Sequence, residues 1–220
     1  MINTIIFDLD GTIADTIDAI MSGMNLTMEK MGYPRKTRKE ILGAINHGAR
    51  ELVRRCLPED VRTDEDKVTE ALAVYQDCYG QTFRETDRLY DGMAEVLLAL
   101  ARRGYIIAVF SNKQDEFVVE LVEKLVPAGV CRLARGQRPG VKAKPDRDVS
   151  LALCRELGVE PANCAFVGDS HVDIRTAKNA DFLSVGVSWG YRPEVLRDEG
   201  ADHIVDKPED LLTLFPSLVG

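Results

Sequence analysis

Five short apolar runs alternate with helical patterns along this chain, and this alternation restricts the fold more than any other feature of the sequence. Within each run the apolar residues are consecutive, which is typical of strands buried on both faces of a sheet. The runs lie at 4–7, 105–110, 164–167, 183–187 and, more weakly, 203–205. Amphipathic stretches such as 93–100 and 148–157 separate them, and Gly104 and Gly158 end these helices. The pattern predicts an α/β fold with a parallel sheet and right-handed crossovers.

The stretch 15–87 interrupts the alternation, because it contains no convincing strand. Apolar residues keep helical spacing at 17–31 and again at 68–79, and two shorter helices are indicated at 37–45 and 49–57. We interpret the methionines of the first stripe as the core of this helical block rather than as an adaptable binding surface. The sequence thus predicts a core of residues 1–14 and 88–220 with a helical insertion at 15–87.

Composition excludes several classes of protein. With 45% hydrophobic residues among 220, the chain is too apolar to be disordered. The net charge of −8 argues against nucleic acid as a partner, and no apolar stretch approaches the roughly 18 residues that a membrane span needs. The cysteines number five, and no two are spaced as a CxxC pair. We therefore expect reduced thiols in a cytoplasmic protein that does not contact the membrane.

Two aspartates follow the first predicted strand. Asp8 and Asp10 are two residues apart, so they point to the same side at the carboxyl end of the strand, where parallel sheets bind ligands. Carboxylates this close repel each other unless a cation or a proton lies between them. Gly11 permits a tight turn whose N–H groups suit an anion. One aspartate could act as a nucleophile while the other transfers protons, or both could simply cap a turn.

Polar residues also follow the next predicted strands. Ser111 and Asn112 could bind phosphate oxygens, or they could form a turn and helix cap. Lys144 precedes a predicted helix. Asp169 and Asp173 are one helical turn apart and could supply oxygen ligands for Mg²⁺, or they could cap the helix. Each motif is ambiguous by itself, but their succession at strand ends indicates an active site.

In these motifs the chain resembles the haloacid-dehalogenase-like hydrolase superfamily, and within it the phosphoglycolate-phosphatase group. The residues that carry the resemblance are Asp8-Leu9-Asp10-Gly11-Thr12, Ser111-Asn112-Lys113, Lys144-Pro145-Asp146, Gly168-Asp169 with Asp173, and Trp189-Gly190-Tyr191. The resemblance implies a Rossmann-like core with an inserted α-helical cap. Many relatives continue Lys-Pro-x-Pro, whereas Arg147 stands in the fourth place here. Pro145 fits the first position of the following helix, and Lys142 competes with Lys144 but lacks the proline.

The resemblance also implies a mechanism for hydrolysing a phosphomonoester. Asp8 attacks the phosphorus and forms an aspartyl-phosphate. Asp10 protonates the leaving alcohol and then takes a proton from the attacking water. Mg²⁺ is held by Asp8, by the backbone carbonyl of Asp10 and by Asp169, while Asp173 is either a ligand or lies behind the ligands.

Further residues of the same motifs are implied to bind the phosphoryl group. Ser111 and the N–H of Asn112 hold phosphate oxygens, together with the turn at Gly11 and Thr12. Lys144 neutralises charge on Asp8 and on the phosphoryl group. The stretch 131–144 contains basic residues and no acidic ones, and we interpret it as a solvated segment that brings positive charge to the site.

The substrate is expected to be a small phosphorylated metabolite, with 2-phosphoglycolate as the best single candidate. His47 and Arg50 lie in the cap, where Arg50 could bind a substrate carboxylate or be an ordinary solvated helix residue. A nucleotidase, a sugar-phosphate phosphatase, a pyrophosphatase and a β-phosphoglucomutase-like mutase remain alternatives. A receiver-like signalling phospho-acceptor is an alternative of another class, but it leaves Asp10 and the helical insertion unexplained. Both a monomer and a homodimer are compatible with the sequence.

Overall fold

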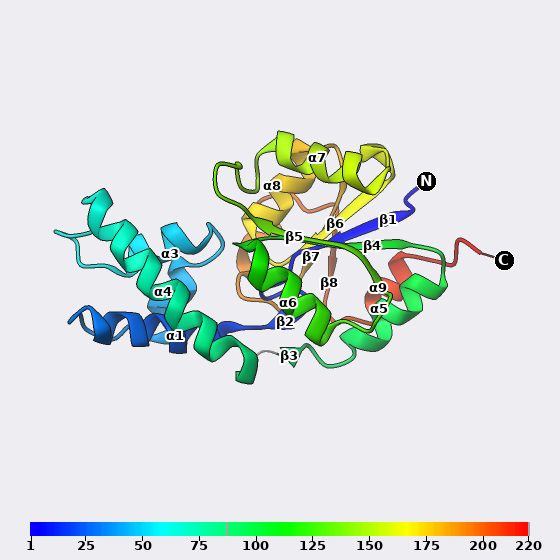
Figure 1. The fold of residues 1–220 in the computed structure, drawn as a ribbon. Helices are drawn as coiled ribbons and strands as arrows, with labels where there is room; N and C mark the ends of the chain where they lie inside the picture. Colours follow the sequence, from blue (N-terminus) through cyan, green and yellow to red (C-terminus); the bar gives the residue numbers. More distant parts are fainter. Residues whose placement is uncertain (87, 220) are drawn as a thin grey trace. The chain divides into compact units, whose positions relative to one another are not determined.

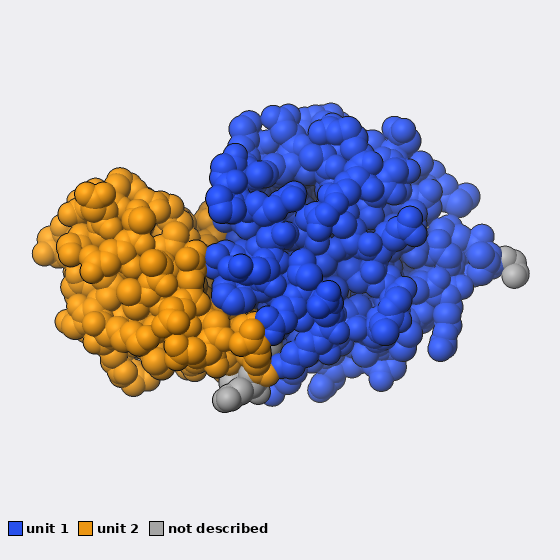
Figure 2. Space-filling model, in the orientation of Figure 1, with its two compact units in different colours: residues 1–15, 88–220 blue, residues 16–87 orange. Residues whose placement is uncertain are grey.

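The computed structural model describes residues 1–86 and 88–219, and the chain divides into two compact units. One unit comprises Met1–Asp15 with Arg88–Gly220, and the other comprises Thr16–Asp87. Figure 2 shows the two units in separate colours. The insertion that we predict at 15–87 begins one residue before the second unit.

Six parallel strands of the described residues form the sheet of the first unit, in the order β5-β4-β1-β6-β7-β8. The strands are β1 (Thr4–Phe7), β4 (Ile106–Gln114), β5 (Cys131–Gln137), β6 (Cys164–Gly168), β7 (Leu183–Val187) and β8 (His203–Val205). Every residue of β1 and β6 is buried, as their uninterrupted apolar sequences predict. The α/β fold with a parallel sheet is therefore confirmed.

The order of the strands reverses at β1, and this reversal determines where the helices lie. From β1 the chain continues to β4 and β5 on one side, then crosses to β6, β7 and β8 on the other. Figure 1 shows α7 and α8 on one face of the sheet and α5, α6 and α9 on the opposite face. The helices are α5 (Met93–Arg102), α6 (Asp115–Leu125), α7 (Arg147–Leu157), α8 (His171–Asn179) and α9 (Asp210–Leu214). Ligands bind at such a switch point, beyond the carboxyl ends of the strands.

Two sequence-based predictions about the first unit are wrong. The segment Cys131–Gln137, interpreted as a solvated basic segment, is the edge strand β5. An edge strand pairs with only one other strand, so charged residues are tolerated there. These residues interrupt the apolar run by which a buried strand is recognised in the sequence. Pro145 is not the first residue of the next helix, because α7 begins at Arg147 and the side chain of Asp146 caps it by accepting from the N–H of Asp148.

The second unit consists of helices. They are α1 (Ile17–Lys30), α2 (Arg38–Ala44), α3 (Ala49–Cys56) and α4 (Glu65–Thr86). Met24 and Met28 of α1 are fully buried, which agrees with a packing role for the methionine stripe. Gly23 lies so close to Tyr79 that a Cβ there would be 2.9 Å from its Cα, so the glycine lets α1 and α4 approach. Each unit therefore has a core of its own.

A short antiparallel ladder lies where the chain leaves and re-enters the first unit. Strand β2 (Ala14–Asp15) pairs with β3 (Arg88–Leu89), with Ala14 opposite Leu89 and Asp15 opposite Arg88. Across the described part of the chain, we find no helix whose length and apolar character would allow it to cross a membrane.

Candidate active site

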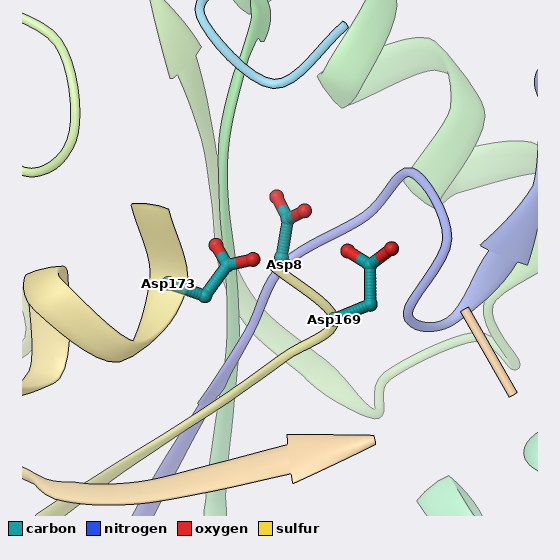
Figure 3. Close-up of side chains that lie close together, drawn as sticks. All are labelled: Asp8, Asp169 and Asp173. Carbon is teal, nitrogen blue, oxygen red and sulfur yellow. The ribbon is translucent and has the colours of Figure 1, made fainter. Parts of the chain in front are cut away.

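Three buried aspartates come together at the carboxyl end of the sheet (Figure 3). Asp8 follows β1, Asp169 follows β6, and Asp173 lies in the first turn of α8. One carboxylate oxygen of each lies within 4.8 Å of the others, and Figure 3 shows the three carboxylates directed to the same side. The exposed fractions are 7%, 0% and 1%, respectively. Such a set of carboxylate oxygens is of the kind that a hard divalent cation takes as ligands.

Lys144 contacts two of these aspartates. Its Nζ donates to Oδ1 of Asp8 at 2.8 Å and to Oδ1 of Asp173 at 2.7 Å, and its side chain is 2% exposed. Lys142, the competing candidate, is exposed and pairs instead with Asp146 and Asp148. Of the two lysines, Lys144 is therefore the one that the chain places in the site.

The charges of this cluster do not balance. Burial raises the pKa of Asp8 to about 7, although the attraction of Lys144 opposes the shift. Burial, together with the charges of Asp173 and Asp8, also raises the pKa of Asp169 well above its usual range. Burial alone would lower the pKa of Lys144, but the two carboxylates outweigh it and raise that pKa. Loss of the protons from all three carboxylates would leave two negative charges that Lys144 does not compensate, and a bound divalent cation would neutralise both.

Asp169 leaves one oxygen available to such a cation. Its Oδ2 accepts the backbone N–H of Tyr191 at 2.6 Å. Its Oδ1 is buried and has no hydrogen-bond partner among the described residues. A buried carboxylate oxygen without a partner is costly, so this atom marks the point where a cation would bind.

Asp173 is oriented by the start of its own helix. Its Oδ2 accepts from the backbone N–H of Ser170 at 3.1 Å and from the hydroxyl of Ser170 at 2.6 Å. The N-cap of α8 is therefore Ser170 rather than an aspartate. A Cβ at Gly168 would overlap the side chain of Asp173, so only glycine fits at the end of β6. These contacts leave Oδ1 of Asp173 for Lys144.

Asn112 and Ser111 lie at the end of β4, at the same edge of the sheet, and are 6% and 3% exposed. The side chain of Asn112 exchanges hydrogen bonds with the backbone of Lys144, at 2.8 and 3.0 Å. The hydroxyl of Ser111 accepts the backbone N–H of Lys113 at 3.3 Å. The sequence motif assigns Asn112 to the phosphate, and the contact of its side chain with Lys144 is visible only in the structure.

Asp10 pairs with Lys113, a residue of the motif at 111–113 to which the sequence assigns no role. Nζ of Lys113 donates to Oδ1 of Asp10 at 2.6 Å, and the side chains are 8% and 17% exposed. Lys113 directly follows Ser111-Asn112 near the end of β4, so its place beside these two residues was a usable signal. Asp10 is thus the more accessible of the two aspartates that follow β1.

The turn after β1 packs against the loop that follows β7. Gly11 has a φ of +80°, and a Cβ there would lie 2.5 Å from Oδ2 of Asp169. Thr12 is fully buried, and its carbonyl accepts from Nε1 of Trp189 at 3.0 Å. The ring of Trp189 also packs edge-on against Tyr90. Trp189 therefore packs this loop onto the turn.

The two candidates in the insertion lie in the second unit, at the start of α3. His47 is half-buried in the bend before the helix, and Arg50 is in its first turn. The guanidinium of Arg50 donates to Glu65 at 2.7 Å and to the hydroxyl of Thr69 at 3.2 Å, and its side chain is 44% exposed. Arg50 thus already pairs with Glu65 and Thr69 on the surface of the second unit.

Comparison with known proteins identifies the family. A family model described as haloacid dehalogenase-like hydrolase matches residues 5–187. Phosphoglycolate phosphatase 1 of Pseudomonas aeruginosa is 30% identical over 214 residues, which cover 94% of this chain and 78% of that protein. N-acetylmuramic acid 6-phosphate phosphatase of the same species is 28% identical over 216 residues, covering 97% and 95%. A solved structure described as a predicted phosphoglycolate phosphatase from Haemophilus somnus matches with a TM-score of 0.89 at 26% identity, covering 98% of both chains.

The chain therefore belongs to the haloacid dehalogenase-like hydrolases, as its motifs predict. Within that family it is an enzyme of the phosphatase branch, since phosphatases resemble it over nearly its whole length. The family match decides against the receiver-like alternative.

Proposed function

We propose that this phosphatase hydrolyses 2-phosphoglycolate in a Mg²⁺-dependent reaction that passes through an aspartyl-phosphate on Asp8. The observation that carries the proposal is the buried cluster of Asp8, Asp169, Asp173 and Lys144, whose charge matches a divalent cation. The choice of substrate rests on the relatives named as phosphoglycolate phosphatases.

The residues present fit Mg²⁺. Asp8 and Asp169 would hold it through carboxylate oxygens, with the backbone carbonyl of Asp10 as a further ligand. The unpartnered Oδ1 of Asp169 supports this assignment. Asp173 already accepts hydrogen bonds at both oxygens, from Lys144 and Ser170. This favours a role in which Asp173 supports the metal ligands and does not itself coordinate the ion. When bound, the ion would neutralise charge on the phosphate and so permit its approach to the carboxylates.

Asp8 and Asp10 would divide the chemistry between them. Lys144 holds Oδ1 of Asp8 and so fixes the orientation of the carboxylate that attacks the phosphorus. The bond between phosphorus and the leaving oxygen breaks as Asp10 gives that oxygen a proton. Water then attacks the aspartyl-phosphate, Asp10 takes a proton from the water, and inorganic phosphate is released. Ser111 and the N–H of Asn112 would hold phosphate oxygens at the end of β4.

The first experiment is a turnover assay with and without Mg²⁺, on the wild type and on Asp8→Asn. Loss of turnover in EDTA and in the variant is expected. Full turnover by Asp8→Asn would disprove the assignment of the nucleophile. Asp10→Asn should slow hydrolysis about 10²- to 10⁴-fold, the usual range for proton transfer. It should retain Mg²⁺ affinity in calorimetry, because its side chain is not a proposed ligand.

N-acetylmuramic acid 6-phosphate is a second candidate substrate, because a relative named for that activity matches 95% of its own length. Ranking both esters by kcat/KM decides between them. Nucleotides, sugar phosphates and pyrophosphate belong in the same screen.

Both leading candidates carry a carboxylate, so Arg50→Ala should lower kcat/KM for them more than for an aryl phosphate. Equal losses would assign Arg50 to its surface contact with Glu65. The cytoplasmic location and the oligomeric state stay predictions.

A further inference from the structure

Lys113 is a buried cation that the proposed mechanism does not use. Its side chain is 8% exposed, and its Nζ lies 2.6 Å from Oδ1 of Asp10. Ion pairs that are exposed to solvent contribute little to stability. A buried pair costs free energy of desolvation, but it holds both side chains in one arrangement. The pair joins the turn after β1 to the end of β4, and these segments are about 100 residues apart in the chain.

An irregularity in β4 accompanies the position of this lysine. In the pairing with β5, Phe110 lies opposite Arg135 and Gln114 lies opposite Gln137. Three residues of β4, from Ser111 to Lys113, therefore face one residue of β5. Bulges of this kind redirect side chains and are frequent next to active sites.

Gly136 is the single residue of β5 that faces the bulge. A Cβ at Gly136 would overlap the carbonyl oxygen of Lys113 and would lie 2.6 Å from Cα of Asp115. Its N–H donates to Oδ1 of Asp115 at 2.7 Å. Gly136 thus leaves space for the bulged segment that carries Lys113, and its N–H holds the side chain of Asp115 at the start of α6.

We propose that Lys113 is a positioning residue that holds the carboxylate of Asp10 for proton transfer to the leaving group. This inference rests on the proposed function, in which Asp10 moves that proton. Proton donation leaves Asp10 as a carboxylate, and the ammonium of Lys113 faces the charge as it develops. Loss of this contact would leave the carboxylate of Asp10 less well positioned, and even small misplacement slows a reaction.

The dependence of rate on the leaving group tests the proposal. An alkyl phosphomonoester, 2-phosphoglycolate or the best ester of the screen, needs a proton on its leaving oxygen. p-Nitrophenyl phosphate releases a stable phenolate and needs that proton less. We expect Lys113→Met to lower kcat/KM for the alkyl ester about tenfold to a hundredfold, and to lower it much less for the aryl ester. Lys113→Arg should restore most of the activity, because a guanidinium can still donate to Asp10.

A double variant shows whether Lys113 acts through Asp10. In an Asp10→Asn background, Lys113→Met should cause no further loss that depends on the leaving group. Lys142→Met, which removes an exposed lysine nearby, should leave both esters unaffected. Thermal unfolding of each variant checks that the fold is retained.

Other outcomes would overturn the proposal in distinguishable ways. Equal losses on both esters, or losses that multiply in the double variant, would make Lys113 a substrate-binding or structural residue. If Asp10→Asn discriminates between the esters and Lys113→Met does not, only the inference about Lys113 fails. If Asp10→Asn itself slows both esters equally, the proton-transfer role of Asp10 in the proposed function fails as well.

Discussion

The side chain of Asn112 and the backbone of Lys144 are joined by two reciprocal hydrogen bonds. The Nδ2 of Asn112 donates to the carbonyl oxygen of Lys144 at 3.0 Å, and its Oδ1 accepts the backbone N–H of Lys144 at 2.8 Å. Both residues are buried, and they are 32 positions apart in the chain. The end of β4 therefore fixes the loop that delivers the lysine.

Removal of this amide should affect stability and catalysis together. Asn112→Ala leaves a buried N–H and a buried carbonyl of Lys144 without these partners, which should lower the free energy of unfolding by about 1 to 3 kcal/mol. The kcat should also fall, because the ammonium of Lys144 is less well held. Urea unfolding and steady-state kinetics measure the two effects. An unfolding free energy equal to that of the wild type would show that these two hydrogen bonds do not stabilise the fold.

Replacement of Lys144 should be far more damaging than replacement of Lys142. Lys144→Met removes the cation that contacts two buried carboxylates, and breaking a buried pair in this way costs about 3 to 5 kcal/mol. Lys142 is exposed, so Lys142→Met should change the unfolding free energy by less than about 1 kcal/mol. Chemical denaturation in EDTA compares the two variants. Similar stabilities would contradict the position of Lys144 between Asp8 and Asp173.

In the metal-free protein, the contribution of Asp8 to stability should fall as the pH rises. Burial raises the pKa of Asp8 to about 7, above the ordinary value of 3.8 that applies in the unfolded chain. Between those two values the folded state keeps a proton that the unfolded state releases, so increasing pH favours unfolding, and the effect levels off above about pH 7. Mg²⁺ should suppress this loss, since bound metal stabilises the carboxylate form.

Denaturation in EDTA and in Mg²⁺, at about pH 5 and about pH 8, measures this linkage. Other carboxylates have lowered pKa values and act in the opposite direction, so the Asp8→Asn variant is the reference. The contribution of Asp8 is the difference between the two proteins at each pH. A difference that does not change with pH would contradict the prediction.

Gly168 should not tolerate even a methyl group. A Cβ there overlaps the carboxylate arm of Asp173, so Gly168→Ala should destabilise the fold by about 1 to 3 kcal/mol and weaken Mg²⁺ binding. Gly43→Ala is a matched control, because Gly43 lies in α2 and has open space around it. The control should raise stability by about 0.5 to 1 kcal/mol. Calorimetry of both variants checks the pair, and unchanged Mg²⁺ affinity in Gly168→Ala would argue against the proposed site.

The parts of the fold with a strong hydrophobic period could be predicted from the sequence. Strands β1 and β6 are uninterrupted apolar runs, and the stripes of α1 and α4 keep helical spacing, so burial and sequence agree there. The edge strand β5 could not be found in this way. Its arginines reach solvent or the exposed Glu156. Because β5 pairs with a neighbouring strand on one side only, its sequence has no continuous apolar run.

The aspartates of the site could be placed together because they follow neighbouring strands. The contacts that support these aspartates could not be predicted, because each depends on the tertiary structure and not on the spacing of residues in the sequence. The contact of Lys113 with Asp10 needs the bulge opposite Gly136, and the hydrogen bond from Tyr191 to Asp169 needs the loop after β7. Such partners depend on tertiary contacts between segments that are distant in the chain.

The ladder of β2 with β3 has a consequence for how this architecture can vary. Because Ala14 and Asp15 pair residue for residue with Leu89 and Arg88, the chain departs from and returns to the core at adjacent points, as it does at the two ends of a hairpin. To the six-stranded sheet, the helices between these points are equivalent to one long hairpin loop. Segments of other lengths and sequences could be exchanged there without shifting the register of the sheet or moving the aspartates. The fold thereby allows the helical insertion to diversify while the chemical core stays the same.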